Sequence, residues 1–324
     1  MIRSFIFKNG KLISRDVGPD LLRLFLYDDD VQMWVDLSEP TAEESKQTLE
    51  TVFSFHPLAL EDCLTISERP KVDEYENCIF LVLHAVDYSS HEFQTNELNL
   101  FIGRNFLVTY HAEPIRSVEA LVERIHRSST AIARAPDRLA YTMIDLLLEN
   151  YMPALEDLSK DFSELERDAL TDIPTDDFLK RVVGLKAEVA RLHQIVGPQR
   201  ETLARIAHGE FRIVRAHLLP YFRDLTNNLA GIADRANAYR DTLNSVVNIH
   251  LSIQQGRVNH VIKVLTVMAT LTLPIVAVAS YYGMNFKLPE MERFTGTDSH
   301  LYVWSVTMVI TLILAGYLRL KKWL

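Results

Sequence analysis

Two long runs without a charged side chain lie near the C-terminus of this 324-residue chain, at residues 264–281 and 301–318. Each run is about 18 residues long, the length at which an α-helix begins to cross a hydrocarbon core of about 30 Å. A buried helical hairpin in a large soluble protein is the alternative, but two uncharged runs with basic flanks fit poorly into a soluble core. The pattern predicts a two-helix transmembrane hairpin.

Basic residues on both sides of the hairpin predict its orientation. They precede the first run and follow the second: Arg257, Lys263, Arg319, Lys321 and Lys322. Lys and Arg are enriched in the cytoplasmic flanks of membrane spans. We therefore expect a multi-pass protein of the inner (plasma) membrane, with both termini in the cytoplasm, an external loop at 282–300 and a basic cytoplasmic tail at 319–324.

Composition excludes several functional classes. A net charge of −9 argues against a nucleic-acid binder, whose binding surface is basic. Cys63 and Cys78 are the two cysteines, too few for a disulfide scaffold or a cysteine-rich metal centre. Because the cysteines and scattered histidines form no nucleophile–base arrangement, we do not expect an enzyme.

Residues 1–135 have the pattern of a mixed α/β domain. Short β-branched or aromatic runs predict strands at 4–8, 33–37, 79–86, 98–102 and 106–109. Asn9-Gly10 and Gly103-Arg104-Asn105 predict hairpin turns between such runs. A capping sequence at residues 38–44, with early acidic residues, predicts the start of a helix. We expect this domain to lie in the cytoplasm.

Residues 136–219 are expected to form acidic, amphipathic cytoplasmic helices. Segment 141–180 has eleven acidic residues against three basic ones, which accounts for nearly the whole net charge. One interpretation is an ordinary solvated helix face. The other is an electrostatic sink that gathers cations.

Residues 220–281 predict one long helix. No proline interrupts the chain between Pro220 and Pro274, and apolar residues recur at helical spacing into the first membrane run. Such a helix would be half stalk and half membrane span. An amphipathic stalk needs partners for its apolar stripe, so we expect a bundle or a ring of identical chains.

Two membrane helices cannot enclose a polar pathway, so a pore requires several copies around an axis. One narrow face of the first span carries small and mildly polar residues at steps of three and four: Asn259, Ile262, Thr266, Ala269, Leu273, Ala277 and Ser280. Close helix packing in lipid would also explain this face. As a pore lining, an uncharged face suits a hydrated ion, and rings of Leu or Ile could close it by dewetting.

The end of the first span reads Tyr282-Gly283-Met284-Asn285-Phe286. A G-M-N triplet at this place, before a short loop and a final helix with a basic tail, resembles the CorA family of divalent-cation channels. Further similar segments are 56–62, 68–72, 220–224 and 263–266. The resemblance implies an α+β cytoplasmic domain, a long helical stalk and a two-helix transmembrane hairpin, assembled as a homopentameric membrane channel.

The resemblance also implies roles for individual residues. The selectivity filter would comprise Tyr282, Gly283, Met284 and Asn285, and the pore and gate would comprise Asn259, Ile262, Leu265, Thr266, Leu273 and Val276. Mg²⁺ loses its water reluctantly and prefers oxygen ligands, so amide and carbonyl oxygens suit its hydrated form. Transport would be driven by the membrane potential, with Co²⁺ and Ni²⁺ as further ions. Lys287 adds a positive charge to a loop one residue shorter than is typical.

The family further implies feedback by intracellular Mg²⁺. Asp62 and Asp224 match paired acids that bridge neighbouring subunits through the ion in the closed state. Glu61 adjoins them, and Asp145 is expected near a second ion. The alternative interpretation is that Asp62 and Asp224 are ordinary acidic residues at helix ends.

Two other functions stay open. The first is a ZntB-like zinc transporter, which would have the same architecture and whose transport could be coupled to protons. His250 and His260 near the inner pore end could bind Zn²⁺, although lone histidines on helices are more often surface or packing residues. The G-M-N triplet favours Mg²⁺. The second alternative is a non-conducting, membrane-tethered sensor or scaffold, which would not need Asn285.

Overall fold

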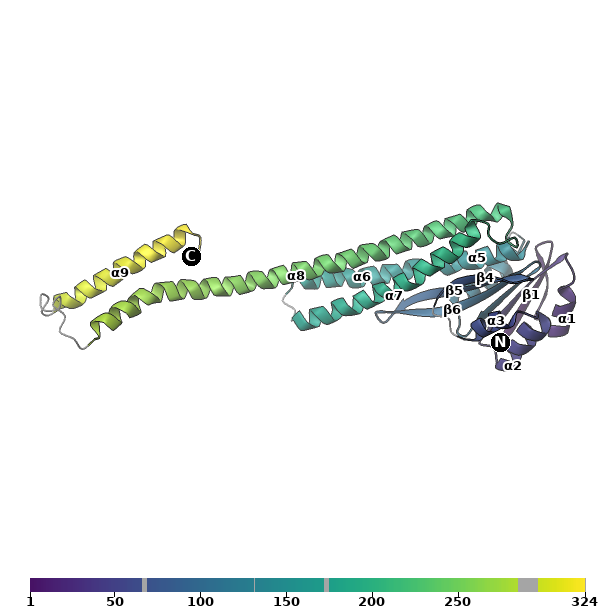
Figure 1. The fold of residues 1–324 in the computed structure, drawn as a ribbon, viewed down its shortest axis with the longest axis horizontal. Helices are drawn as coiled ribbons and strands as arrows, with labels where there is room; N and C mark the ends of the chain where they lie inside the picture. Colours follow the sequence, from purple (N-terminus) through teal and green to yellow (C-terminus); the bar gives the residue numbers. More distant parts are fainter. Residues whose placement is uncertain (66–68, 131, 172–174, 285–296, 324) are drawn as a thin grey trace. The chain divides into compact units, whose positions relative to one another are not determined.

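The computed structural model describes residues 1–65, 69–130, 132–171, 175–284 and 297–323. The chain divides into two compact units, residues 1–247 and residues 248–324. Helix α8 (Leu219–Tyr282) begins in the first unit and ends in the second. Figure 1 shows the elements of both units.

A seven-stranded mixed sheet forms the centre of the first unit, in the order β2-β1-β3-β7-β6-β5-β4. Adjacent strands are antiparallel except for the central pair β3 and β7, which is parallel. The strands are β1 (Ile2–Lys8), β2 (Lys11–Arg15), β3 (Val31–Ser38), β4 (Lys71–Glu74), β5 (Cys78–Ser89), β6 (Glu92–Gly103) and β7 (Phe106–His111).

All five predicted strands are confirmed, as are both turns. Asn9 and Gly10 have positive φ values of 52° and 76°, which fit the tight turn between β1 and β2. The edge strands β2 and β4 were not predicted from the sequence. They are short and rich in charged residues, so they lack the apolar run that reveals a central strand.

Short helices cover one face of the sheet. They are α1 (Pro19–Phe25), α2 (Ala42–Ser45), the π-helix η1 (Lys46–Val52) and α3 (Pro57–Leu64). Met33, Val35 and Phe80 point into this layer and are fully buried. The predicted helix start is confirmed: the Thr41 hydroxyl accepts from the Glu44 amide, and the Glu44 carboxylate accepts from the Thr41 amide.

Longer helices form a second core with the other face (Figure 1). They are α4 (Arg116–Arg127), α5 (Pro136–Glu149), α6 (Tyr151–Ala169), α7 (Thr175–Ala207), the 3₁₀ turn η2 (Ala216–Leu218) and the first half of α8. Alternate strand residues such as Trp34 and Leu81 point into this core. Because β-strand side chains alternate between faces, one sheet supports two cores.

A buried charged cluster joins the central strands. Asp36 on β3 is fully buried and pairs with Arg3 on β1 at 2.8 Å. Its other carboxylate oxygen accepts from the Thr109 hydroxyl at 2.6 Å and lies 3.2 Å from His111 Nε2, both on β7. Burial acts to raise the pKa of Asp36, but hydrogen bonds from His111, Thr109 and Arg3 hold that pKa below its ordinary value.

The second unit contains the end of α8 and α9 (Thr297–Leu320), drawn in light green and yellow in Figure 1. Both helices are long and apolar enough to cross a membrane, with mean hydropathies of 2.2 and 1.9 over their most apolar windows. Helix α9 begins four residues before the predicted run. Among the residues of this unit that the structure describes, few apolar side chains are buried within the chain.

Candidate functional site

Helix α8 carries the predicted stalk and first span without a break. Pro274 lies inside the helix. Because proline lacks an amide hydrogen, it cannot donate to the carbonyl of Thr270 four residues earlier. Helices in membranes tolerate proline when nearby groups satisfy the freed backbone. The predicted continuity of the helix is therefore confirmed through the proline.

The predicted pore residues of α8 fall into two groups around the helix. At 100° per residue, Asn259, Ile262, Thr266 and Leu273 lie within an arc of about 60°. Leu265 and Val276 lie on one flank, about 80° from the middle of that arc. Within the chain the apolar members are exposed, Leu273 by 68%. The stripe therefore lacks cover from described residues of its own chain.

Hydroxyl groups of the spans donate to their own helices. The Thr266 hydroxyl donates to the Ile262 carbonyl, and the Thr270 hydroxyl donates to the Thr266 carbonyl, each at 2.7 Å. Thr307 and Thr311 of α9 make the same bond one turn back. With its hydrogen committed to the helix, the Thr266 oxygen can accept a hydrogen bond from a water molecule. Such a group suits an ion that keeps its hydration shell.

The predicted filter begins where α8 ends. Tyr282 is the last helical residue, and the Gly283 amide donates to the Ala279 carbonyl at 2.9 Å. A side-chain Cβ at position 283 would lie 2.9 Å from that carbonyl oxygen, so the close turn favours glycine. Met284 is half exposed. Asn285 and Lys287 lie outside the described residues.

Asp62 and Glu61 lie on α3. Asp62 makes an ion pair with Lys71 of β4, with 2.5 Å between Lys71 Nζ and the Asp62 carboxylate. Glu61 is exposed, and its backbone carbonyl accepts from the Thr65 hydroxyl. Asp62 therefore has a cation as its partner within one chain, and any ion shared with another subunit would have to compete with that cation.

Asp145 and Asp224 share a second neighbourhood. Burial raises the pKa of the half-buried Asp145 on α5, and the carboxylates of Glu149 and Asp224 raise it further. A cavity of about 350 Å³ lies beside Asp145, between α5 and α8, and its polar lining consists of Asp145, Glu149, Asn227, Asn228 and Arg235. A hydrated divalent cation would reduce the repulsion between these carboxylates, and the nearby amide oxygens could accept hydrogen bonds from its water.

Three residues of this neighbourhood, Glu149, Asn227 and Asn228, were not predicted from the sequence. Glu149 follows Asp145 by four residues, and Asn227 and Asn228 follow Asp224 by three and four. This spacing places them on the same helix faces and could have revealed them. Among the described residues, no three His, Cys, Asp or Glu side chains form a group that could hold a metal ion.

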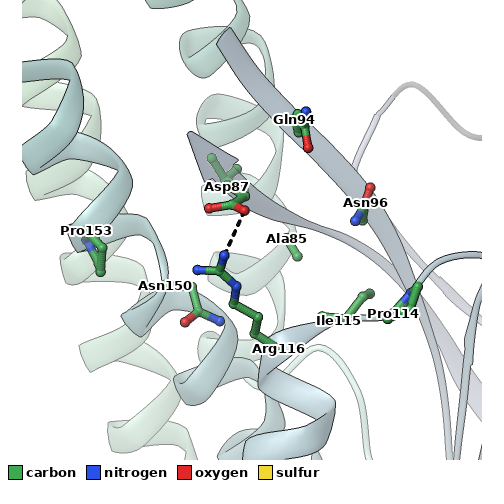
Figure 2. A pocket seen from close by; sticks show the side chains of 10 residues that line it. Ala85, Asp87, Gln94, Asn96, Pro114, Ile115, Arg116, Asn150 and Pro153 are labelled. Atoms are coloured by element: carbon green, nitrogen blue, oxygen red, sulfur yellow. Dashed lines mark hydrogen bonds and ion pairs between the residues drawn. The ribbon is translucent and has the colours of Figure 1, made fainter. Parts of the chain in front are cut away.

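A smaller cavity of about 90 Å³ lies between the β5–β6 hairpin and the start of α4 (Figure 2). Arg116 and Asp87 form an ion pair across it at 3.1 Å, and Gln94, Asn96 and Asn150 contribute amides. Its single carboxylate is already neutralised by Arg116. The lining therefore offers little to a divalent cation.

The family profile described as CorA-like Mg²⁺ transporter protein matches residues 29–322. The chain belongs to the CorA family. It is 30% identical over 301 residues to the cobalt/magnesium transport protein CorA of Thermotoga maritima, covering 92% of this chain and 85% of that protein. It is 24% identical to the protein of the same name from Methanocaldococcus jannaschii, covering 98% of each.

Solved structures of related proteins show the same fold. The complete CorA magnesium transporter of Methanocaldococcus jannaschii matches with a TM-score of 0.80 at 22% identity, covering 99% of this chain and 98% of that one. The full-length CmaX protein matches with a TM-score of 0.75 at 16% identity, covering 98% and 97%. The profile match and the identity to the Thermotoga maritima protein confirm the resemblance to the CorA family. The family consists of membrane transport proteins for divalent cations and is not an enzyme class.

Proposed function

We propose that this CorA-family protein is a channel for uptake of hydrated divalent cations, chiefly Mg²⁺, driven by the membrane potential. The observation that supports this proposal is the continuity of helix α8. It begins beside the acidic helices, contains the uncharged stripe of predicted pore residues and ends at Tyr282, directly before Gly283 and Met284. Five copies would place their stripes around an axis. Residues 1–219 and the 319–324 tail are cytoplasmic in this arrangement, and 282–300 is the external loop.

The lining favours an ion that retains its water. From residue 264 to Met284 the chain has no charged residue, so the path provides no ligand strong enough to strip or trap Mg²⁺. Thr266 offers a hydroxyl oxygen to the hydration shell, and Asn285 at the mouth would offer amide oxygens. Ile262, Leu265 and Leu273 would form the apolar constrictions. Co²⁺ and Ni²⁺ have similar hydrated forms and are proposed as further ions.

Intracellular Mg²⁺ would act as the closing signal. Asp62, Asp224, Glu61 and Asp145 are proposed to hold it between neighbouring subunits. The raised pKa of Asp145 supports this proposal, because that carboxylate lies in a field that a cation would neutralise. When internal Mg²⁺ falls, the carboxylates repel, the ring loosens and the pore opens by a shift in population.

The transport proposal is tested by ion flux into liposomes that contain the purified protein and a Mg²⁺-sensitive dye. We expect uptake under an inside-negative potential, which Asn285→Ala abolishes. Asn248→Ala, an exposed amide on α8, is the matched control and should leave uptake unchanged. Equal uptake by Asn285→Ala and the control would contradict the filter assignment.

The feedback proposal needs a separate variant. Asp62→Ala combined with Asp224→Ala should leave the channel conducting at millimolar internal Mg²⁺. The control, Asp234→Ala with Asp241→Ala, also removes two exposed carboxylates and should close normally. Normal closure of both double variants would argue against these residues as the regulatory site.

Zinc transport is the second candidate. The ZntB cytoplasmic domain of Vibrio parahaemolyticus shares the fold of the cytoplasmic part, with a TM-score of 0.57 at 14% identity. Fluxes of Mg²⁺, Co²⁺ and Zn²⁺ measured at two pH values separate the candidates. A Zn²⁺ flux that exceeds the Mg²⁺ flux and depends on pH would favour the ZntB-like function.

A further inference from the structure

The second unit is basic at one end of its hairpin. No Asp or Glu occurs in residues 248–284 or 301–323, whereas five Lys and Arg side chains lie before the first span and after the second: Arg257, Lys263, Arg319, Lys321 and Lys322. Those segments therefore contribute positive charge but no Asp or Glu side chain. Elsewhere in the chain, cations commonly pair with acids, as Lys71 does with Asp62.

A hydrogen bond brings the two groups of cations to one place. Lys263 Nζ donates to the backbone carbonyl of Lys322 at 2.8 Å, across 59 residues of sequence. This bond uses one of the three donors of the ammonium group. Residues from both ends of the hairpin are thus in contact. Figure 1 shows α9 running back along the last part of α8.

A tight turn fixes the end of α9. Lys322 has a φ of 57°, in the left-handed region. The Lys322 amide donates to the Arg319 carbonyl, and the Trp323 amide donates to the Leu318 carbonyl at 2.9 Å. This is the bond pattern of a Schellman cap, here with lysine where glycine is usual. The turn holds the Lys322 carbonyl for Lys263 and leaves the Lys321 and Lys322 side chains exposed.

Apolar side chains adjoin the cations. Leu320 is 86% exposed and Trp323 is 44% exposed. Tryptophan is enriched at membrane interfaces because its ring is amphipathic. On this surface the basic groups can bind a negatively charged headgroup, while the exposed indole and leucine contact the acyl chains. An arginine can hold a phosphate by two parallel hydrogen bonds, as Arg319 is free to do from its exposed position.

We propose that Lys263, Arg319, Lys321 and Lys322 form a binding site for an anionic phospholipid headgroup, of the phosphatidylglycerol type, in the inner leaflet. The site rests on the membrane orientation of the proposed function. Each basic residue near an anionic surface contributes about 1 kcal/mol, or about fivefold in affinity. Three exposed cations on the α9 tail are enough for a strong preference over a zwitterionic lipid.

The test measures lipid preference directly. The full chain carrying Trp304→Phe is reconstituted into phosphatidylcholine vesicles that contain brominated phosphatidylglycerol or brominated phosphatidylcholine. Trp34 is buried in the first unit and gives a constant background, so quenching reports lipid at Trp323. We expect a preference for phosphatidylglycerol of about tenfold or more, because each basic residue near the headgroup contributes about fivefold and more than one takes part. Equal quenching by the two lipids would overturn the proposal.

Variants distinguish this site from general charge. Arg319→Gln with Lys321→Gln and Lys322→Gln should bring the preference close to one, whereas Lys8→Gln with Lys11→Gln and Lys46→Gln, three exposed cations of the first unit, should leave it unchanged. Arg319→Lys keeps the charge and should retain most of the preference. An unchanged preference in the first triple variant would overturn the proposal.

Measurements on the unaltered chain remain informative where a triple variant fails to fold. The preference should fall as salt rises, because the Debye length falls from about 10 Å at 0.1 M to 3 Å at 1 M. A preference that is insensitive to salt would contradict a headgroup site. Inorganic phosphate at matched ionic strength should not reduce quenching, since a lipid is also held by its chains. Competition by phosphate at equal ionic strength would identify a free-anion site and overturn the lipid assignment.

Quenching does not depend on conduction. A lipid preference without Mg²⁺ flux would leave the lipid site standing and defeat the transport proposal. Flux without a lipid preference would do the reverse.

Discussion

The two units of the chain differ in whether their apolar side chains are buried within the chain. In the first unit, Trp34 stacks on Phe5, is fully buried and donates to the Thr109 hydroxyl at 3.0 Å. In the second unit, Trp304 is 73% exposed, along with many leucines, valines and isoleucines. The first unit provides its own interior, whereas the second needs an apolar solvent or other copies of the chain to cover it.

Polar groups follow the same division. The first unit surrounds its buried Asp36 with Arg3, Thr109 and His111. The membrane-spanning stretch of the second unit uses hydroxyls that donate to their own helix, and no charged group occurs there. A folded interior can hold a charge by building partners around it. A helix that faces lipid must be satisfied within itself.

Among the substitutions that test this comparison, replacing Trp34 should cause the largest loss of stability. We expect Trp34→Ala to lower the unfolding free energy of the first unit by about 3–5 kcal/mol, because it creates a cavity and removes the donor to Thr109. Trp304→Ala in the second unit is the matched control and should leave that stability nearly unchanged. Hydrogen exchange of the β3 and β7 amides in the solubilised protein measures both. Similar losses from the two variants would mean that the units are not independent in stability.

Removing the buried charge should give a similar or slightly smaller loss. Asp36→Ala leaves Arg3 and His111 without their buried partner, and breaking such a pair costs about 3–5 kcal/mol. The pKa of Asp36 is lowered by folding, so its contribution is present above the unfolded value of about 3.9 and is lost as pH falls below it. Unfolding measured from about pH 6 to about pH 3, the range in which carboxylates titrate, should be less pH-dependent in Asp36→Asn than in the unaltered protein. An unaltered pH profile would contradict this assignment.

Mg²⁺ should stabilise the first unit through its acidic cavity. Burial and the carboxylates of Glu149 and Asp224 raise the pKa of Asp145, so folding makes ionisation of this carboxyl less favourable, and a bound cation would offset that cost. At ten times the dissociation constant, binding adds about 1.4 kcal/mol. Asp145→Asn should reduce the Mg²⁺-dependent rise in melting temperature, whereas Asp234→Asn should not. An equal rise in both variants would place the ion elsewhere.

The smallest effect is expected at the tip of the β5–β6 hairpin. His91 Nδ1 lies 2.9 Å from Asp161, which also accepts from the Tyr88 hydroxyl at 2.5 Å. The hydrogen bond with Asp161 raises the pKa of His91, so the contact is complete below about pH 6.5 and is lost as pH rises through the folded value. Because His91 is exposed, His91→Gln should cost only about 0.2–1 kcal/mol.

Hydrogen exchange at the hairpin tip measures this contact. Protection there should decrease with rising pH in the unaltered protein, after correction for intrinsic exchange, and should lose that dependence in His91→Gln. Protection that follows pH equally in both proteins would rule out the His91 contact as its source.

The parts of the fold that the sequence predicts are those with a strong local signal. The central strands are continuous apolar runs, and α8 has no interior proline before Pro274. The parallel pairing of β3 with β7 could not be predicted, because the paired residues Asp36 and Thr109 are 73 residues apart in the sequence. A charged residue such as Asp36 also normally indicates a surface position, so its burial in the centre of the sheet was not expected. Strand β4 reads Lys-Val-Asp-Glu and forms a strand through its pairing with β5.

The candidate site shows the same limit. Helical spacing alone predicts the stripe through Asn259 and Thr266, since residues three and four apart share a face. It does not predict the ion pair between Asp62 and Lys71, which joins a helix to an edge strand. It also does not predict that the Asp224 carboxylate lies close enough to raise the pKa of Asp145, because the two residues belong to helices α5 and α8, which come together only through tertiary packing.

The central claim is that several copies of the hairpin surround one water-filled path. Electron microscopy of the full chain in lipid nanodiscs tests it most directly. We expect a ring of five subunits whose axial opening is lined by the α8 residues Asn259, Thr266 and Leu273, with Asn285 at its outer end. A monomer, or a ring in which α9 faces the axis or in which no opening exists, would contradict it.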